Sequence, residues 1–212
     1  MVTPDAQRTM CTYLGASVGL GPADVDPDLV ARAAVTYLEG YLWDPPEAKE
    51  AFRAAMAAAK GAGRRVALTL SDPFCVERHR AEFAELVDGQ VDILFANRDE
   101  IAALYEAGSV EDAVAAVRGR CEMAVITLSE EGSLVVTADE VHRVPAAPVE
   151  RVVDTTGAGD LFAAGFLHAF TQGRPPAECA RIGGIAAAEI ISHVGARPEQ
   201  DLRALVASAL PA

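Results

Sequence analysis

Short runs of apolar and β-branched residues alternate with longer, alanine-rich stretches over the first two thirds of the chain. The runs predict strands near Thr9–Leu14, Val35–Glu39, Val66–Leu70, Ile93–Ala96 and Ala124–Leu128. The stretches between them have helical periodicity, most clearly over Pro46–Lys60, Val76–Val87 and Val110–Arg118. This alternation is typical of βα units with strands covered on both faces. We therefore predict an α/β fold with a mainly parallel sheet flanked by helices.

The pattern changes after Leu128. Gly132–Thr137 and Val141–Val144 are separated by the turn-like Ala138-Asp139-Glu140, which predicts an antiparallel hairpin. The chain from Gly157 onward is mainly helical, with helices expected over Ala158–Thr171, Pro176–His193 and Pro198–Ala209. Neither a repeat nor a disordered linker interrupts this order, so we predict one domain over residues 1–212.

Charge and composition exclude several classes of partner. The 212 residues include 31 acidic and 18 basic side chains, and the net charge of −13 repels nucleic acids and anionic membrane surfaces. The sequence contains neither an apolar run of about 20 residues nor an amino-terminal export signal. The four cysteines and four histidines are scattered, which favours packing in a reducing compartment over metal binding. We expect a soluble, cytoplasmic protein without nucleic-acid or membrane partners.

Polar residues follow the predicted strands. Glu39 and Asp72 follow two of them, Asn97 follows a third, and Thr127 with Ser129 closes a fourth. Parallel sheets bind ligands beyond the carboxyl ends of their strands, so these residues indicate a ligand site at one edge. Each alone fits a helix cap or a turn equally well.

The run from Asp154 to Phe166 joins an expected short strand to a long helix. The small residues Gly157, Ala158 and Gly159 permit close backbone approach, and the amino terminus of the following helix can hold an anion. In phosphoryl transfer, backbone N–H groups of 157–160 would stabilise the moving group while Asp160 accepts the proton of the acceptor hydroxyl. The alternative is that Asp160 only caps its helix. The glycine patterns of P-loop ATPases and dinucleotide-binding dehydrogenases are absent from the sequence.

The run Asp154-Thr155-Thr156-Gly157-Ala158-Gly159-Asp160 resembles the carboxy-terminal signature of the ribokinase/PfkB carbohydrate kinases, which include adenosine kinases. The resemblance implies a ribokinase-like core that transfers the γ-phosphate of ATP to a hydroxyl of a sugar or nucleoside. It further implies that Asp160 is the catalytic base and that Gly157, Ala158 and Gly159 form the anion hole. Asp154 and Thr156 match the side chains that bind a monovalent cation such as K⁺ in this family.

Two further segments resemble motifs of the same family in the same order. Asn97-Arg98-Asp99-Glu100 resembles the N-x-x-E motif, in which Asn97 and Glu100 would help to place Mg²⁺ and the phosphates. In isolation, an Asn cap followed by a first-turn Glu explains this spacing better. The segment 127–132 resembles the T-x-G-x-x-G nucleotide loop, with Thr127, Ser129 and Gly132 at its defined positions. Ser129 replaces the usual first glycine, and the alternative for this segment is a simple hairpin entry.

Family members carry roughly a hundred further residues before the matching region, including the lid and most acceptor contacts. The resemblance therefore predicts an amino-terminally incomplete core. The competing hypothesis is a nucleotide-binding fragment without catalytic activity, which acts by interaction or needs a complementing amino-terminal segment. An unfinished sheet also predicts self-association or the uptake of a partner, and of these we expect a homo-oligomer. The segment Glu39–Asp44 is similar to adenosine-kinase-like members but does not identify the acceptor.

Overall fold

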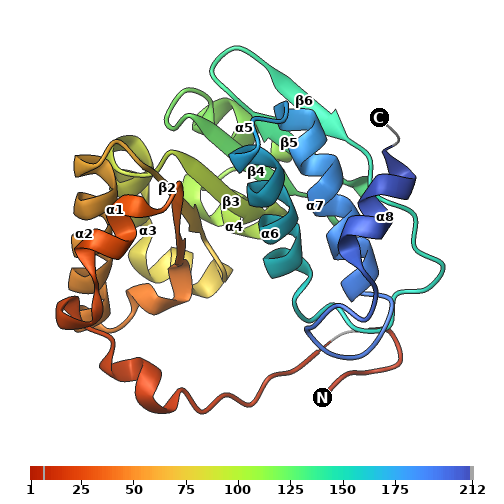
Figure 1. Ribbon diagram of the computed structural model, residues 1–212, viewed down its shortest axis with the longest axis horizontal. Helices are drawn as coiled ribbons and strands as arrows, with labels where there is room; N and C mark the ends of the chain where they lie inside the picture. The colour runs from red at the N-terminus through yellow and green to blue at the C-terminus, as the bar shows by residue number, and fades with distance from the viewer. Residues whose placement is uncertain (7, 211–212) are drawn as a thin grey trace. The chain divides into compact units, whose positions relative to one another are not determined.

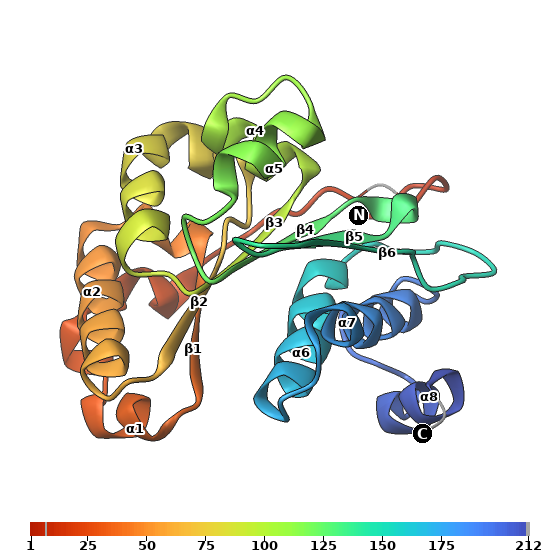
Figure 2. The same cartoon turned by 90° about the horizontal axis from the view of Figure 1, so that it is seen from above.

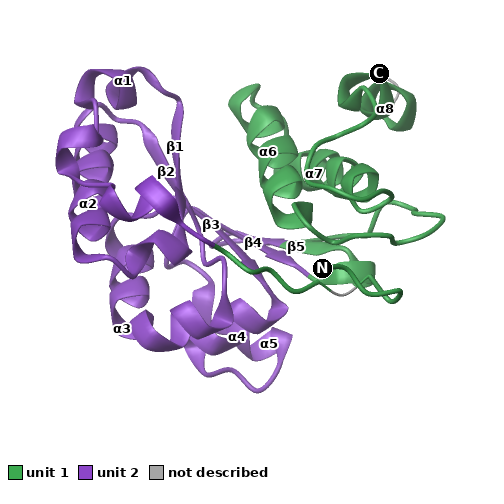
Figure 3. Cartoon of the chain, turned by 90° about the horizontal axis from the view of Figure 1, so that it is seen from below, with its two compact units in different colours: residues 1–12, 128–134, 142–212 green, residues 13–127, 135–141 purple. Residues whose placement is uncertain are grey.

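The computed structural model describes residues 1–6 and 8–210 (Figure 1). The chain forms two compact units, which Figure 3 shows in different colours. Unit 1 comprises residues 1–12, 128–134 and 142–212, and unit 2 comprises residues 13–127 and 135–141. The single domain expected over residues 1–212 stays a prediction.

Unit 2 contains four parallel strands. They are β1 (Val35–Glu39), β2 (Arg65–Thr69), β3 (Ile93–Asn97) and β4 (Met123–Thr127). Each pairs in parallel with the next along the chain. The first four residues of β3 and of β4 are all buried, because these strands are covered on both faces. The parallel order brings the carboxyl ends of all four strands to the same edge of the sheet.

Helices follow the strands of unit 2. They are α2 (Pro46–Gly61), α3 (Pro73–Gly89), α4 (Arg98–Tyr105) and α5 (Val110–Val117), with the short α1 (Pro27–Arg32) before β1. The side chains of Asp72, Asn97 and Ser109 accept hydrogen bonds from first-turn N–H groups, which explains where α3, α4 and α5 begin. Figure 2 shows α2, α3 and α4 along one side of these strands.

Unit 1 contains the helices of the carboxy-terminal part of the chain. They are α6 (Ala158–Thr171), α7 (Pro176–Ile190) and α8 (Leu202–Ala209). Helices α6 and α7 cross closely, because a Cβ added to Gly183 would lie 2.6 Å from the carbonyl oxygen of Phe162. Phe162 and Phe166, which belong to α6, have buried side chains. This close packing fixes α6, whose first turn belongs to the signature run.

Strands β5 (Ser133–Val136) and β6 (Val141–Val144) complete a sheet with the order β1-β2-β3-β4-β5-β6. The Thr137 amide donates to the Glu140 carbonyl oxygen at 2.9 Å and closes the turn between them. Neighbouring strands joined by so short a connection run antiparallel, since a parallel pair needs a long crossover. The sheet is therefore mainly parallel, and the predicted α/β fold is confirmed.

Two short segments expected as strands adopt other structures. Residues 9–14, all of which are described, form no strand, and the side chains of Met10 and Tyr13 are 67% and 95% exposed. These two apolar side chains are therefore not part of the hydrophobic core of the described structure. No strand precedes the signature run within the described residues 145–157 either. There the Val153 amide donates to the Ile191 carbonyl oxygen at 2.8 Å, so the segment pairs with the end of α7.

Two helix ends also differ from expectation. The helix expected over Pro176–His193 ends at Ile190, because the following residues turn back over the Glu189 carboxylate. The helix expected over Pro198–Ala209 begins at Leu202, where Asp201 accepts hydrogen bonds from the Arg203 and Ala204 amides. The other predicted helices and strands are confirmed apart from small shifts at their ends. Over the described part of the chain, we find no helix with the length and apolar character needed to cross a membrane.

Candidate functional site

Asp154 organises the signature run in unit 1. Its side chain is buried, and Oδ1 accepts hydrogen bonds from the amide of Thr156 at 2.9 Å and from its hydroxyl at 2.6 Å. Oδ2 accepts from the Gly195 amide at 3.1 Å. These bonds, with the Thr156 hydroxyl foremost, lower the pKa of Asp154 to about 2. Asp154 is therefore an ionised anchor for the turn that leads into α6.

The first turn of α6 begins at Gly157, whose φ of +82° is the left-handed conformation that favours glycine. No side chain caps this turn. The Ala158 amide bonds to the Thr155 carbonyl oxygen, and the Leu161 amide bonds to that of Gly157. The amides of Gly159 and Asp160 find no protein acceptor within the described chain. Free N–H groups at the positive end of a 14-residue helix are suited to an anion.

Asp160 lies in this first turn with its residue exposed. The capping interpretation does not describe its position, because Gly157 occupies the N-cap and Asp160 stands three residues later. The neighbouring Gly159 is also exposed, and a Cβ built there would meet nothing within 4 Å. A ligand can therefore approach the free amides and the Asp160 carboxylate from solvent.

Arg8 is a candidate residue that sequence reasoning missed. Its Nη1 donates to the Thr155 hydroxyl at 2.8 Å, and its positive charge helps to lower the pKa of Asp154. The two hydrogen-bonded side chains are separated by 147 positions in the sequence. Nothing in the local pattern around Arg8 indicates such a contact. The motifs that carry the family resemblance do not include Arg8, so they could not indicate its contact with Thr155.

Asn97 and Glu100 form a second candidate group, in unit 2, at the carboxyl end of β3. The Asn97 amide and its Nδ2 donate to the two oxygens of Glu100 at 2.9 and 2.7 Å, and the Glu100 amide donates to Asn97 Oδ1 at 2.9 Å. This is the capping arrangement that the spacing alone favours. Burial, and then the negative charges of Asp72, Asp99 and Glu39, raise the pKa of Glu100 to about 7.

The expected convergence of polar strand ends is found within unit 2. Glu39 ends β1, and the Ser71 hydroxyl, which follows β2, donates to Glu39 Oε2 at 3.2 Å. Asn97 at the end of β3 is the register partner of Thr127 at the end of β4. The negative groups around Glu100 therefore form an acidic edge, defined as Glu39, Asp72 and Glu100. A divalent cation would relieve the repulsion within this edge.

The segment 127–132 makes a tight turn after β4. The Leu128 amide donates to the Gly132 carbonyl oxygen at 2.8 Å, and the Gly132 amide donates to that of Ser129 at 3.1 Å. A Cβ on Gly132 would lie 2.0 Å from the Val144 carbonyl oxygen, so only glycine fits. Ser129, which replaces the usual glycine, has a φ of +53°. This left-handed conformation costs a residue other than glycine about 1 kcal/mol. The glycine-like backbone is retained at that cost.

A further cluster in unit 2 brings together Asp44, Cys75 and His79, with ligand atoms within 4.8 Å of one another. Cys75 and His79 lie one turn apart on α3, a relationship that the scattered positions of the histidines concealed. Arg78 Nη2 donates to Asp44 Oδ2 at 2.7 Å, and His79 Nε2 lies 2.8 Å from Oδ1. The arginine therefore neutralises the carboxylate, and we interpret the cluster as an ion-pair network.

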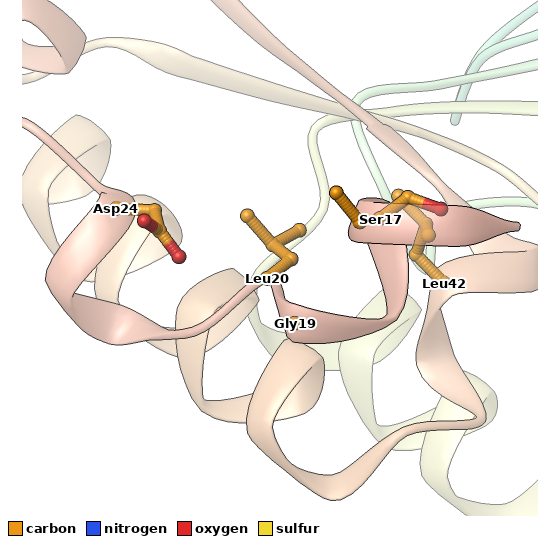
Figure 4. A pocket seen from close by; sticks show the side chains of 6 residues that line it. Ser17, Gly19, Leu20, Asp24 and Leu42 are labelled. Carbon is orange, nitrogen blue, oxygen red and sulfur yellow. The ribbon is translucent and has the colours of Figure 1, made fainter.

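A shallow depression in unit 2 lies beside the 3₁₀ segments Gly15–Gly19 and Pro22–Asp24 (Figure 4). Its lining residues are Ala16, Ser17, Gly19, Leu20, Asp24 and Leu42. Asp24 Oδ2 already accepts a hydrogen bond from the Gly21 amide at 2.9 Å. None of the residues predicted for the site lines this depression, so it does not belong to the candidate site.

Comparison with known proteins gives matches along nearly the whole chain. The model of the pfkB family carbohydrate kinases matches residues 1–202. A curated cytidine kinase of Thermococcus kodakarensis is 36% identical over 138 residues, which are 63% of this chain and 49% of that protein. The solved structure of adenosine kinase from Sinorhizobium meliloti is 53% identical, with a TM-score of 0.96 over 99% of this chain and 64% of the other.

A second solved structure, a probable sugar kinase from Rhizobium etli CFN 42, is 48% identical. The match has a TM-score of 0.96 and covers 98% of this chain and 63% of the Rhizobium etli chain. The chain thus spans about half the length of the curated relative and less than two thirds of each of these two structures.

Proposed function

Because the chain belongs to the pfkB family of carbohydrate kinases, we propose that it binds ATP with magnesium and transfers the γ-phosphate to a hydroxyl of a sugar or nucleoside. The observation that supports this most directly is the uncapped first turn of α6, with Asp160 exposed beside free amides. An anion site alone would not need a carboxylate, which repels phosphate. A carboxylate is needed when a hydroxyl must be oriented and deprotonated.

In the proposed mechanism, the free amides of Gly159 and Asp160 stabilise the charge that spreads over the phosphoryl oxygens. Asp160 holds the acceptor hydroxyl in line and accepts its proton as the new P–O bond forms and the bond to ADP breaks. Asp154, whose pKa of about 2 keeps it ionised, maintains the turn that aims these amides. Arg8, held at the Thr155 hydroxyl, supplies a positive charge for a phosphate oxygen.

Magnesium neutralises negative charge on the phosphate oxygens when it is bound. We assign it to the acidic edge of unit 2, where Asn97 and Glu100 supply oxygen atoms of the type that Mg²⁺ prefers. Thr127, Ser129 and Gly132 form the tight turn proposed for the nucleotide. K⁺ is proposed for Asp154 and Thr156, because the Asp154 carboxylate is ionised and accepts a hydrogen bond from the Thr156 hydroxyl, which places the two candidate ligands side by side.

We propose a nucleoside as the acceptor to test first. The adenosine kinase from Sinorhizobium meliloti is 53% identical over almost the whole chain, and the relative from Thermococcus kodakarensis is named a cytidine kinase. A sugar remains the second class, since the Rhizobium etli relative is named a probable sugar kinase.

Isothermal titration with Mg·ATP and Mg·ADP tests the binding part of the proposal. We expect dissociation constants below the millimolar range, with weaker binding by an Asn97→Ala variant. A folded sample that binds neither nucleotide at millimolar concentration would contradict the proposal. ADP release with adenosine, cytidine and ribose then tests transfer. Nucleotide binding without acceptor-dependent ADP release would favour the competing function, a nucleotide-binding chain that needs a further segment for catalysis.

A further inference from the structure

Glu189, near the end of α7, has a buried carboxylate with no role in the mechanism above. Its side chain is 1% exposed, and Oε1 accepts hydrogen bonds from the amides of Glu199 and Gln200 at 2.8 and 2.9 Å. The same oxygen lies 3.3 Å from Nε2 of His193. A buried carboxylate costs free energy unless it is paired and hydrogen-bonded, and only Oε1 has such partners, because Oε2 is buried without a hydrogen-bond partner among the described residues. All partners of the Glu189 carboxylate belong to the segment 191–200, which follows α7. His193 lies in the first half of this segment, and Glu199 and Gln200 lie at its end, so Glu189 connects both parts of the segment to the helix.

The segment 191–200 also contacts the signature run within unit 1. The Val153 amide donates to the Ile191 carbonyl oxygen at 2.8 Å, and the Gly195 amide donates to Asp154 Oδ2 at 3.1 Å. A Cβ on Gly157 would lie 3.2 Å from the Cβ of Ala196. Three features of the signature therefore contact the segment that Glu189 holds. They are the residue before the anchor carboxylate, the carboxylate itself and the glycine that opens α6.

We propose that Glu189 is a positioning residue for the phosphate-binding turn. Its carboxylate fixes the segment 191–200, and Gly195 and Ala196 of that segment hold Asp154 and Gly157 in place. Donors at an anion hole are effective when they are already aimed before the anion arrives. A segment of ten residues without helix or strand would otherwise sample many conformations, and ordering it on binding would weaken affinity. The coupling rests on the geometry alone, whereas the identity of the anion rests on the proposed function.

Hydrogen exchange followed by mass spectrometry tests the coupling, because it reports on amides that do not touch Glu189. The samples are the wild-type chain, Glu189→Ala, Glu189→Gln and the matched control Glu178→Ala. Glu178 lies on the same helix and pairs with Arg174 at the surface, away from the segment 191–200. Glu189→Gln keeps an acceptor oxygen for the two amides but loses the charge that faces His193.

In Glu189→Ala we expect exchange to accelerate about tenfold or more in peptides covering 153–157 and 191–200, with the middle of α6 unchanged. Glu189→Gln should give a smaller acceleration in the same two regions, and Glu178→Ala none. Titration of the same samples with Mg·ADP should show affinity falling about tenfold in Glu189→Ala and less in Glu189→Gln. If Glu189→Ala does not fold, the comparison of Glu189→Gln with Glu178→Ala decides the matter.

The proposal is overturned if exchange accelerates only in 191–200 while 153–157 stays protected in both Glu189 variants. In that case Glu189 stabilises its own loop and nothing more. Unchanged Mg·ADP affinity in both variants would overturn it as well. A wild-type chain that binds no nucleotide, yet shows the coupled exchange, would instead refute the proposed function and leave the link between Glu189 and Asp154 established.

Discussion

Gly165 and Gly183 bring the backbones of α6 and α7 into direct contact. A Cβ on Gly165 would lie 3.0 Å from the Cα of Gly183 and 3.0 Å from the Ile182 carbonyl oxygen. A Cβ on Gly183 would lie 2.6 Å from the Phe162 carbonyl oxygen. Because the obstructing atoms are backbone, neither can move aside without separating the helices. The crossing therefore depends on these two glycines, and the position of the turn proposed to bind phosphate depends on the crossing.

Gly183→Ala should destabilise the protein by about 1–3 kcal/mol, the usual cost of overpacking in a close-packed interior. Gly184→Ala is the matched control. It changes the next residue of the same helix, where a Cβ would meet nothing closer than the Ala147 amide at 4.0 Å. Since alanine favours helix over glycine, the control should be neutral or stabilising by up to about 1 kcal/mol. Urea unfolding followed by circular dichroism measures both, and equal stability of the two variants would contradict the crossing as described.

The local sequence predicted most of the helices and strands, but it did not predict which distant segments contact them. α6 begins and ends where expected, because the glycines and the helical period of its residues are local signals. Residues 9–14 have a strand-like pattern, yet Tyr13 is almost fully exposed, and only the tertiary structure could show that this apolar run is exposed. The end of α7 was missed for a similar reason. It depends on hydrogen bonds from Glu199 and Gln200 to Glu189, about ten residues away.

The pKa of Glu100 predicts a dependence of stability on pH. Burial raises that pKa from 4.5 to about 7, so the folded state binds the proton more tightly than the unfolded chain does. Between these two pH values the unfolded carboxyl is ionised while the folded one is still protonated, so stability falls as the pH rises. The free energy of unfolding falls by about 3 kcal/mol in total, and this fall is complete once the pH is above the pKa of Glu100 in the folded state.

Glu100→Gln imitates the protonated form and removes this titration. We expect the stability difference between wild type and variant to shift by that amount between pH 4.5 and 7, in the absence of magnesium and nucleotide. Other titrating groups are common to both proteins and cancel in the difference. Parallel stability curves over this range would show that Glu100 is ionised throughout.

The site divides into a part that sequence reveals and a part that it does not. Asp154, Thr156 and Gly157 act through contacts within a few residues, so their spacing indicates the turn they form. Arg8 and Gly195 reach the same turn from distant segments, and no spacing rule connects them with it. The backbone of Ser129 shows a third case. Its left-handed conformation could not be foreseen from a serine, because the surrounding turn imposes it.

The cysteines should differ sharply in reactivity. Cys11 is exposed, whereas Cys75 and Cys179 are buried, and burial raises the pKa of each of these two thiols to about 11. At pH 8 such thiols are ionised to only about one part in a thousand, and the thiolate is the reactive form. We expect iodoacetamide to modify Cys11 rapidly in the native protein. A Cys11→Ser variant should react slowly until urea unfolds it. Native labelling of Cys75 at the rate of Cys11 would contradict the burial described.

Asp160→Asn tests the catalytic assignment. The substitution removes one negative charge beside the proposed phosphate site, so Mg·ADP affinity should stay within a few-fold or improve. Turnover should fall by about 10²-fold or more, since general bases contribute 10²–10⁴. A carboxylate in the first turn also favours the helix by about 0.3–1 kcal/mol, so a small loss of stability is expected and must be measured separately.

Asp139→Asn is the matched control, because it removes the same charge from an exposed position in the turn between β5 and β6. It should change neither affinity nor turnover. ADP release with adenosine, cytidine and ribose is measured for wild type and both variants. Full activity of Asp160→Asn would refute the mechanism, because the hydroxyl proton would then have another acceptor. If the wild type binds nucleotide but transfers phosphate to none of these acceptors, the proposal that Asp160 lies beside the bound phosphates can still be tested. The effect of Asp160 would then appear only in nucleotide affinity, where loss of its charge should strengthen binding.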